Sequence, residues 1–211
     1  MEILAQLWDV VVHLDRYLAV FLANYGVWIY ALLFLIVFCE TGLVLLPFLP
    51  GDSLLFVAGA LAGTGGMDIG ILCATLIAAA ILGNSVNYSV GRYLGPKVFH
   101  WENSRFFNRG ALLKTHAFYE LHGGKMLVLT RFLPILRTFA PFVAGIGEMP
   151  YARFQFFNII GGVLWVVSLT LSGYWLGNLP GVKSNLSIVI SVIVVISVLP
   201  AVIGYIKHRR A

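Results

Sequence analysis

The sequence predicts an all-α integral membrane protein with about four spanning helices, two opposed re-entrant helical hairpins and an N-terminal amphipathic helix. Three observations support this fold class. First, 60% of the 211 residues are hydrophobic and only 11% are charged, whereas soluble domains contain about 25% charged residues. Second, the charges leave long apolar gaps between them. Third, two further apolar stretches are interrupted by proline and by charge. Lipid must therefore solvate much of the surface.

The spanning helices are expected in the gaps between charged residues. Each gap can supply the ~20 apolar residues that cross a bilayer as a helix. We expect these helices near residues 26–46, 70–91, 154–177 and 186–206.

Residues 1–23 differ, because charges interrupt apolar residues at helical spacing. This pattern predicts an amphipathic helix that lies in the membrane interface. The helix could instead cross the membrane if it packed against protein.

Two stretches are too broken to span, one near residues 44–62 and one near residues 126–147. Each contains prolines, and proline removes a backbone donor and breaks a helix. Backbone groups freed inside lipid must find partners in protein or water. We therefore expect two re-entrant hairpins within a single membrane domain, 1–211.

The two broken stretches resemble each other. A Phe-Leu-Pro run ending at Pro50 precedes a Phe-Val-Ala-Gly run ending at Gly59, and the same order recurs at Pro134 and Gly145. The first repeat would cover 26–95 and the second 126–177. A basic loop, 96–125, would join them, and a last spanning helix would follow at 186–206.

The distribution of lysine and arginine predicts the orientation. Basic residues concentrate in the central loop and in the tail from Lys207 to Arg210, and cytoplasmic loops carry such an excess. The C-terminus should then be cytoplasmic, and the spanning helices of the two repeats should run in opposite directions. Inverted repeats with broken helices at matching positions are typical of transporters.

Two carboxylates fall inside the membrane region, Glu40 and Asp52. An ionisable residue inside a membrane helix is a functional candidate by default, and both could bind a proton or a cation. Alternatively, Glu40 belongs to a structural ion pair or lies at the helix end, and Asp52 caps the helix that follows it.

Arg131 and Arg137 flank Pro134 in the second broken stretch. Arginine stays protonated, so both residues require anionic partners, either the two carboxylates or a phosphate. Arginine binds phosphate through two parallel hydrogen bonds, which makes the pair a candidate headgroup site. Snorkelling to the interface is the alternative.

The second expected helix carries Asn84, Asn87 and Tyr88. Together with Pro50 and Pro134, these residues are candidates for lining a polar pathway. Packing and interhelical hydrogen bonding are the alternative role of such polar residues.

The sequence contains no nucleophile elbow, no phosphate-binding Walker loop and no zinc-binding HExxH motif, so we expect neither an enzyme nor a cofactor or metal site. Basic residues sit at the ends of apolar segments, and we expect no nucleic-acid partner. Faces rich in glycine and alanine permit a homodimer.

Four motifs together resemble the DedA family, the bacterial branch of the VTT-domain membrane proteins. They are Phe-Cys-Glu-Thr-Gly around Glu40, Pro-Phe-Leu-Pro-Gly-Asp-Ser around Asp52, Asn-Tyr-x-x-Gly-Arg from Asn87, and Arg-Phe-x-Pro-x-x-Arg-Thr from Arg131. The resemblance covers nearly the whole chain.

The resemblance implies a bacterial inner-membrane protein with two opposed re-entrant loops. It also implies transport that depends on the proton motive force and supports the cell envelope, including movement of undecaprenyl phosphate or phospholipid between leaflets. The essential acids of the family would fall on Glu40 and Asp52, and its essential arginines on Arg131 and Arg137. Many members carry aspartate where this chain has Asn84.

Three functions follow as hypotheses. The first is a proton-coupled lipid translocase, a flippase or scramblase. The second is a proton-coupled exporter of a small solute or cation that uses the same acids. The third is a non-transporting membrane organiser.

Overall fold

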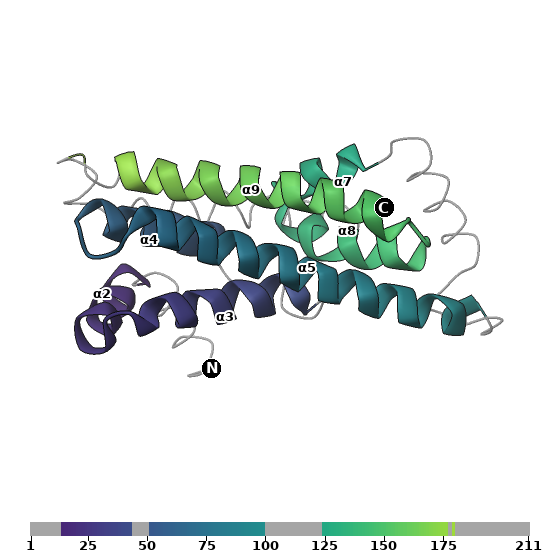
Figure 1. The fold of residues 1–211 in the computed structure, drawn as a ribbon, viewed down its shortest axis with the longest axis horizontal. Coiled ribbons are helices and arrows are strands. Elements are labelled where there is room, and N and C mark those ends of the chain that lie inside the picture. The colour runs from purple at the N-terminus through teal and green to yellow at the C-terminus, as the bar shows by residue number, and fades with distance from the viewer. Residues whose placement is uncertain (1–13, 44–50, 100–123, 177–178, 180–211) are drawn as a thin grey trace, which may run out of the picture. The chain divides into compact units, whose positions relative to one another are not determined.

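The computed structural model describes residues 14–43, 51–99, 124–176 and 179, and its regular elements there are all α-helices (Figure 1). They are α2 (Leu14–Tyr25), α3 (Trp28–Gly42), α4 (Gly51–Gly63), α5 (Ile69–Phe99), α7 (Lys125–Thr130), α8 (Pro134–Ile146) and α9 (Tyr151–Leu176). The all-helical prediction is confirmed for this part of the chain. The predicted helix 186–206, most of the basic loop and the first half of the amphipathic helix lie outside the described residues.

In the described part of the chain, two helices are long and apolar enough to cross a membrane. They are Ile69–Gly95 within α5, and Tyr151–Leu176, which match the expected helices near 70–91 and 154–177. Large apolar side chains are exposed on these helices and on α3, among them Trp28 at 68%, Ile71 at 55% and Leu164 at 49%. Such a surface suits a lipid solvent.

The first expected helix is shorter than predicted. Helix α3 has 15 residues, or about 22 Å at 1.5 Å per residue. It begins after a turn in which Gly26 adopts a positive φ of 52°, a conformation that glycine reaches without steric cost.

The two broken stretches contain short helices. Helix α4 follows the first group of prolines, and α7 and α8 are separated by a break at residues 131–133. Pro134 is the first residue of α8, a position where its missing N–H costs no hydrogen bond. The helix therefore restarts at the proline, while re-entry from one side of a bilayer stays a prediction.

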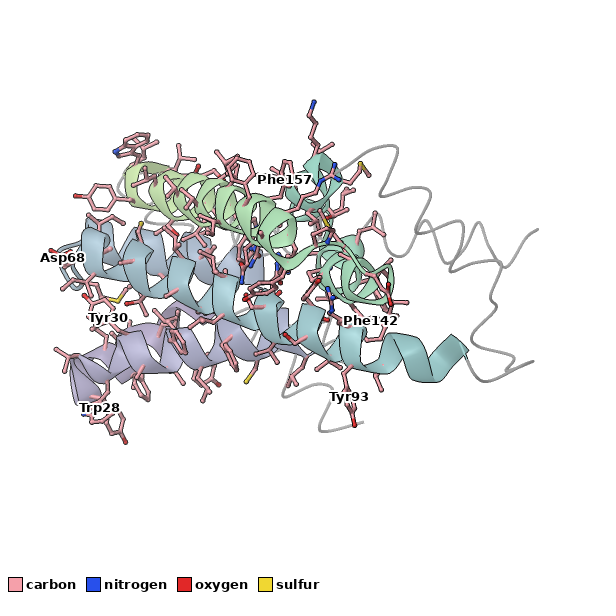
Figure 2. The ribbon with its side chains drawn as sticks, turned by 45° about the vertical axis from the view of Figure 1, so that its right-hand side comes forward. Trp28, Tyr30, Asp68, Tyr93, Phe142 and Phe157 are labelled. Carbon is pink, nitrogen blue, oxygen red and sulfur yellow. The ribbon has the colours of Figure 1, made fainter. Side chains whose placement is uncertain are left out.

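The described residues form two compact units, whose boundaries fall inside α3, α5 and α9. The first comprises the described residues within 1–36, 48–77 and 166–211. Here α2 packs on α4. The start of α5 is fixed twice, since Asp68 Oδ1 accepts from the Ile71 N–H at 2.9 Å while the Asp68 N–H donates to the Tyr30 hydroxyl at 2.8 Å (Figure 2).

Helices α4 and α9 approach closely in the first unit. A Cβ atom added to Gly59 would overlap the carbonyl oxygen of Thr170, and one added to Gly173 would overlap that of Phe56. Small residues permit this backbone approach in membrane helices. The Phe-Val-Ala-Gly run of α4 thus packs on the C-terminal part of α9.

The second unit comprises the described residues within 37–47 and 78–165, and it repeats this contact. A Cβ atom on Gly91 of α5 would overlap the carbonyl oxygen of Phe142, and one on Gly145 of α8 would overlap that of Tyr88. Tyr88 also stacks on Phe154 with ring centroids 4.3 Å apart. The core around it is completed by Leu127, Ala140, Ala144 and Met149.

The two units therefore have matching contacts at matching positions. The second Phe-Val-Ala-Gly run packs on the C-terminal part of the first long helix, as the first run packs on the second long helix. The short helix of each sequence repeat is paired with the long helix of the other repeat. The repeat seen in the sequence thus has a structural counterpart.

Candidate functional site

A buried ion pair joins α3 to α8 in the second unit. The Arg137 guanidinium donates through Nη2 to Oε1 of Glu40, although 97 residues separate them in sequence. The side chains are 3% and 0% exposed. The guanidinium also lies 4.8 Å from the ring centroid of Trp165, a cation–π distance. Glu40 and Arg137, two of the charged residues for which the sequence requires partners, thus meet each other.

The backbone around the ion pair is held by a close helix contact and by Asn87. A Cβ atom on Gly83 of α5 would overlap Thr41, so glycine lets α3 lie against α5. Asn87 Nδ2 donates to the carbonyl oxygens of Thr41, at 3.1 Å, and Thr138, at 2.8 Å. These are the residues that follow Glu40 and Arg137 in the chain, so one amide fixes both sides of the pair.

Arg131 is the second buried arginine, with 2% of its surface exposed. It is the C-cap residue of α7, at the break before α8. Its Nη2 donates to Oδ1 of Asn158, at 2.5 Å, and to the main-chain oxygen of the same residue, at 3.2 Å. A Cβ atom on Gly161 would lie 3.0 Å from its Cδ, so the glycine makes room for the side chain against α9.

Asn158 is the centre of a polar network. Its Oδ1 also accepts from Asn84 Nδ2 at 3.2 Å. Its Nδ2 donates to the Ile81 carbonyl at 3.1 Å and to Gln155 Oε1 at 2.9 Å. Gln155 Nε2 in turn donates to Ser85 Oγ at 2.7 Å. The network connects the buried Arg131 with the more exposed side of α5 and α9.

One donor of this network is unsatisfied. In the described part of the chain, Arg131 Nη1 is buried without a hydrogen-bond partner, and no carboxylate lies within 4.0 Å of the side chain. Arg137 is near enough to repel it electrostatically. A buried charge without an ionic partner is costly, and a buried unsatisfied donor in a native protein needs an explanation, such as a bound ion or water.

The remaining predicted residues lie as follows. Asn84, Asn87 and Tyr88 are buried, and Tyr88 donates to the Met149 carbonyl. Their hydrogen bonds agree with the packing alternative, and a pathway role stays a prediction. Asp52 lies half-buried in the first turn of α4, within the first unit. Pro50 lies outside the described residues.

Sequence reasoning missed Asn158, Gln155 and Gly161. All three lie in the apolar run of α9. The available signal in the sequence was a lone asparagine three residues before a Gly-Gly pair at 161–162. A buried amide in a membrane helix requires a partner, and Arg131 is that partner. No group of three or more histidine, cysteine, aspartate and glutamate residues that could hold a metal occurs among the described residues.

Comparison with known proteins identifies relatives over the whole chain. The VTT domain family model matches residues 49–175. Protein DedA of Escherichia coli (strain K12) is 53% identical over 213 residues, covering 100% of this chain and 97% of the relative. An uncharacterized membrane protein of Mycobacterium leprae (strain TN) is 47% identical over 83% of this chain and 80% of its own length. Inner membrane protein YghB of Escherichia coli (strain K12) is 40% identical over 74% and 72%. No solved structure matches.

Proposed function

Because the chain belongs to the DedA family of VTT-domain membrane proteins, we propose that it is an inner-membrane transporter that moves an anionic lipid between leaflets. Undecaprenyl phosphate and phospholipid are the candidate substrates. The proton motive force drives the movement, which supports the cell envelope. The observation that carries the proposal is the unsatisfied Nη1 of the buried Arg131.

A phosphate headgroup supplies what Arg131 lacks. It brings negative charge and several acceptor oxygens, and a hydrogen bond between arginine and phosphate is charge-assisted. Asn158 occupies Nη2 on one side of the guanidinium, which leaves Nη1 for a phosphate oxygen. Arg137 is the other buried arginine of this unit and would add a second positive charge.

Proton coupling follows from the ion pair. While Glu40 is ionised, it neutralises Arg137. A proton on Glu40 removes that negative charge and frees Arg137 to bind the phosphate. The proton and the phosphate then enter together, so that the buried charge changes little. Asp52 is the second proposed proton site, in the first turn of α4.

The test is exchange of labelled lipids between leaflets by the purified protein in liposomes, with and without a pH gradient. Undecaprenyl phosphate, phosphatidylglycerol and phosphatidylcholine serve as substrates. Arg131→Gln and Glu40→Gln should abolish exchange of the anionic lipids. Arg153→Gln is the matched control, because Arg153 is exposed on α9, and it should keep full exchange.

Three outcomes would overturn the proposal. Lipid exchange that persists in the Arg131→Gln variant would show that Arg131 does not bind the headgroup. Solute or cation uptake without lipid exchange indicates the solute exporter. Absence of all transport by folded protein, with Glu40→Gln silent in cells, indicates the membrane organiser.

A further inference from the structure

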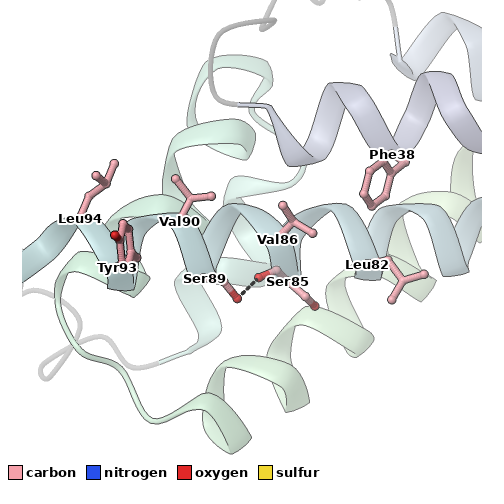
Figure 3. Close-up of a pocket in the computed structure, with 8 residues that line it drawn as sticks. All are labelled: Phe38, Leu82, Ser85, Val86, Ser89, Val90, Tyr93 and Leu94. Atoms are coloured by element: carbon pink, nitrogen blue, oxygen red, sulfur yellow. Dashed lines mark hydrogen bonds between the residues drawn. The ribbon is translucent and has the colours of Figure 1, made fainter.

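The surface of α5 carries a long groove in the second unit. The groove has a volume of about 570 Å³ and is lined by α5 residues from Leu82 to Leu94 together with Phe38 of α3 (Figure 3). Leu82, Val86 and Val90 recur at helical spacing along it and are 50%, 43% and 41% exposed. From residue 82 to residue 94 the helix rises about 18 Å, a little more than the ~15 Å of one hydrocarbon leaflet.

A second cleft adjoins this groove. It has a volume of about 520 Å³, and its lining residues include Ser89 and Tyr93, which line the groove as well. Arg92, Tyr151 and Pro150 complete its more polar wall. The apolar groove and the polar cleft therefore form one continuous surface, which we call the α5 lipid groove.

Arg92 is oriented toward this cleft by neutral partners. Its Nη1 donates to the Tyr88 hydroxyl at 2.9 Å and, more weakly, to the Met149 carbonyl at 3.5 Å. The side chain is exposed. Glu148 acts on it electrostatically, but in the described part of the chain no carboxylate lies within 4.0 Å of it. The guanidinium thus offers a positive charge without a direct ion pair in the described part of the chain, beside an apolar groove.

The position along the helix fits the edge of the hydrocarbon region. Arg92 is three residues before the end of the membrane-length segment Ile69–Gly95, where arginine extends to the interface. Tyr93 and Tyr151 are 67% and 50% exposed, and Figure 2 shows Tyr93 pointing away from the helices. Tyrosine is enriched at the headgroup level of membranes.

We infer that the α5 lipid groove binds an anionic membrane phospholipid, with one acyl chain along Leu82, Val86 and Val90 and the phosphate at Arg92. The apolar length accommodates a chain of one leaflet, and the exposed guanidinium selects a negatively charged headgroup. A zwitterionic phospholipid would occupy the groove with less affinity, because its positive group offsets the attraction of Arg92.

The groove also connects with the buried site. Ser85 and Ser89 line it, and Ser85 accepts the hydrogen bond from Gln155 that begins the network leading to Arg131. A headgroup held at Arg92 lies on the same face of α5 as these serines. Binding in the groove does not require the proposed transport, and it would hold in a non-transporting membrane protein as well.

The test is photo-crosslinking in lipid nanodiscs with the full chain. Phosphatidylglycerol that carries a photoactivatable acyl chain is diluted into phosphatidylcholine, and labelled peptides are identified by mass spectrometry. We expect label on residues 82–94, removed more effectively by unlabelled phosphatidylglycerol than by unlabelled phosphatidylcholine. Arg92→Gln should reduce labelling about fivefold, the factor for one basic residue at an anionic surface. Val86→Trp, which fills the groove, should abolish it.

Controls separate binding from folding and from transport. Arg153→Gln and Ile71→Trp change exposed positions outside the groove and should leave labelling intact. Arg131→Gln should also leave it intact while lipid exchange is lost, so failure of the proposed transport is distinguishable from failure of the groove. Label spread evenly over lipid-facing helices overturns the inference. The headgroup assignment is overturned if Arg92→Gln does not change the labelling. It is also overturned if photoactivatable phosphatidylcholine labels the groove as strongly as photoactivatable phosphatidylglycerol.

Discussion

Asn158 accepts through Oδ1 the hydrogen bond that Arg131 donates through Nη2, at 2.5 Å. The same oxygen accepts from Asn84, so a single amide connects α5, α9 and the break between α7 and α8. This arrangement makes Asn158 a positioning residue for the proposed headgroup site.

Asn158→Ala should therefore destabilise the protein. It leaves Arg131 Nη2 with only a main-chain acceptor at 3.2 Å and removes the acceptor of Asn84 Nδ2, and an orphaned buried donor costs about 1–3 kcal/mol. The midpoint of thermal unfolding in detergent should fall by several degrees. Ser172→Ala on the same helix is the control, because the Ser172 hydroxyl donates only within its own helix. Equal stability of the two variants would contradict the role given to Asn158.

The ion pair between Glu40 and Arg137 should respond differently to single and double substitution. Removing one partner leaves an uncompensated buried charge, which costs about 3–5 kcal/mol. Glu40→Leu with Arg137→Met removes both charges, and apolar replacement of a buried pair is often neutral. In thermal unfolding, the midpoint temperature should fall strongly for each single variant and return toward that of the unchanged protein in the double variant.

The double variant also tests the proposed function. We expect it to be folded and inactive in leaflet exchange, since both charges take part in proton and phosphate binding. Normal exchange by the double variant would mean that the pair serves packing alone.

Gly161→Ala should impair exchange with little loss of stability. The added methyl would lie 3.0 Å from Arg131 Cδ and 3.1 Å from Nε, so the guanidinium must shift by a few tenths of an ångström. We expect the exchange rate to fall on the order of tenfold, because misplacing a binding group by up to 1 Å has effects of this size or larger. Gly162→Ala is the neighbouring control, since its Cβ would first meet Ile81 Cγ1 at 3.3 Å. An equal exchange rate for both variants would contradict the role given to Gly161.

Gly59→Ala and Gly145→Ala should destabilise the protein by similar amounts. Each added Cβ would overlap a backbone carbonyl of the facing long helix, and overpacking of this kind costs about 1–3 kcal/mol or more. Ala74→Leu, at an exposed position of α5, should leave the unfolding midpoint unchanged. A large loss for only one of the two glycines would show that the two contacts differ in strength despite their matching geometry.

Composition and charge spacing were sufficient to predict the helical class and the two long helices, because a bilayer demands long apolar runs. They also identified Glu40, Arg131 and Arg137 as residues that need partners. The pairing itself could not be predicted. Arg137 meets Glu40, whereas Arg131 meets the amide of Asn158, and that choice depends on which faces of α3, α8 and α9 come together.

The ends of the helices were predicted less well than their existence. Helix α3 starts two residues later than the apolar run suggests, because Gly26 turns the chain. Helix α5 continues to Phe99, beyond the arginine at which charge spacing placed its end. An arginine can mark the membrane boundary while the helix continues beyond it. Hydropathy therefore predicts where the membrane span ends, but it does not predict where the helix ends.

The short helix of each repeat packs on the long helix of the other repeat, and this pairing has a consequence for biosynthesis. The close contact of Gly59 in α4 is made with a helix segment that is synthesised roughly 110 residues later, around Thr170. At ribosomal rates of about 5–20 residues per second, the first half must wait on the order of ten seconds for its partner. The halves cannot mature one after the other, because the α4 contacts of the first half are completed only when the last part of α9 has emerged.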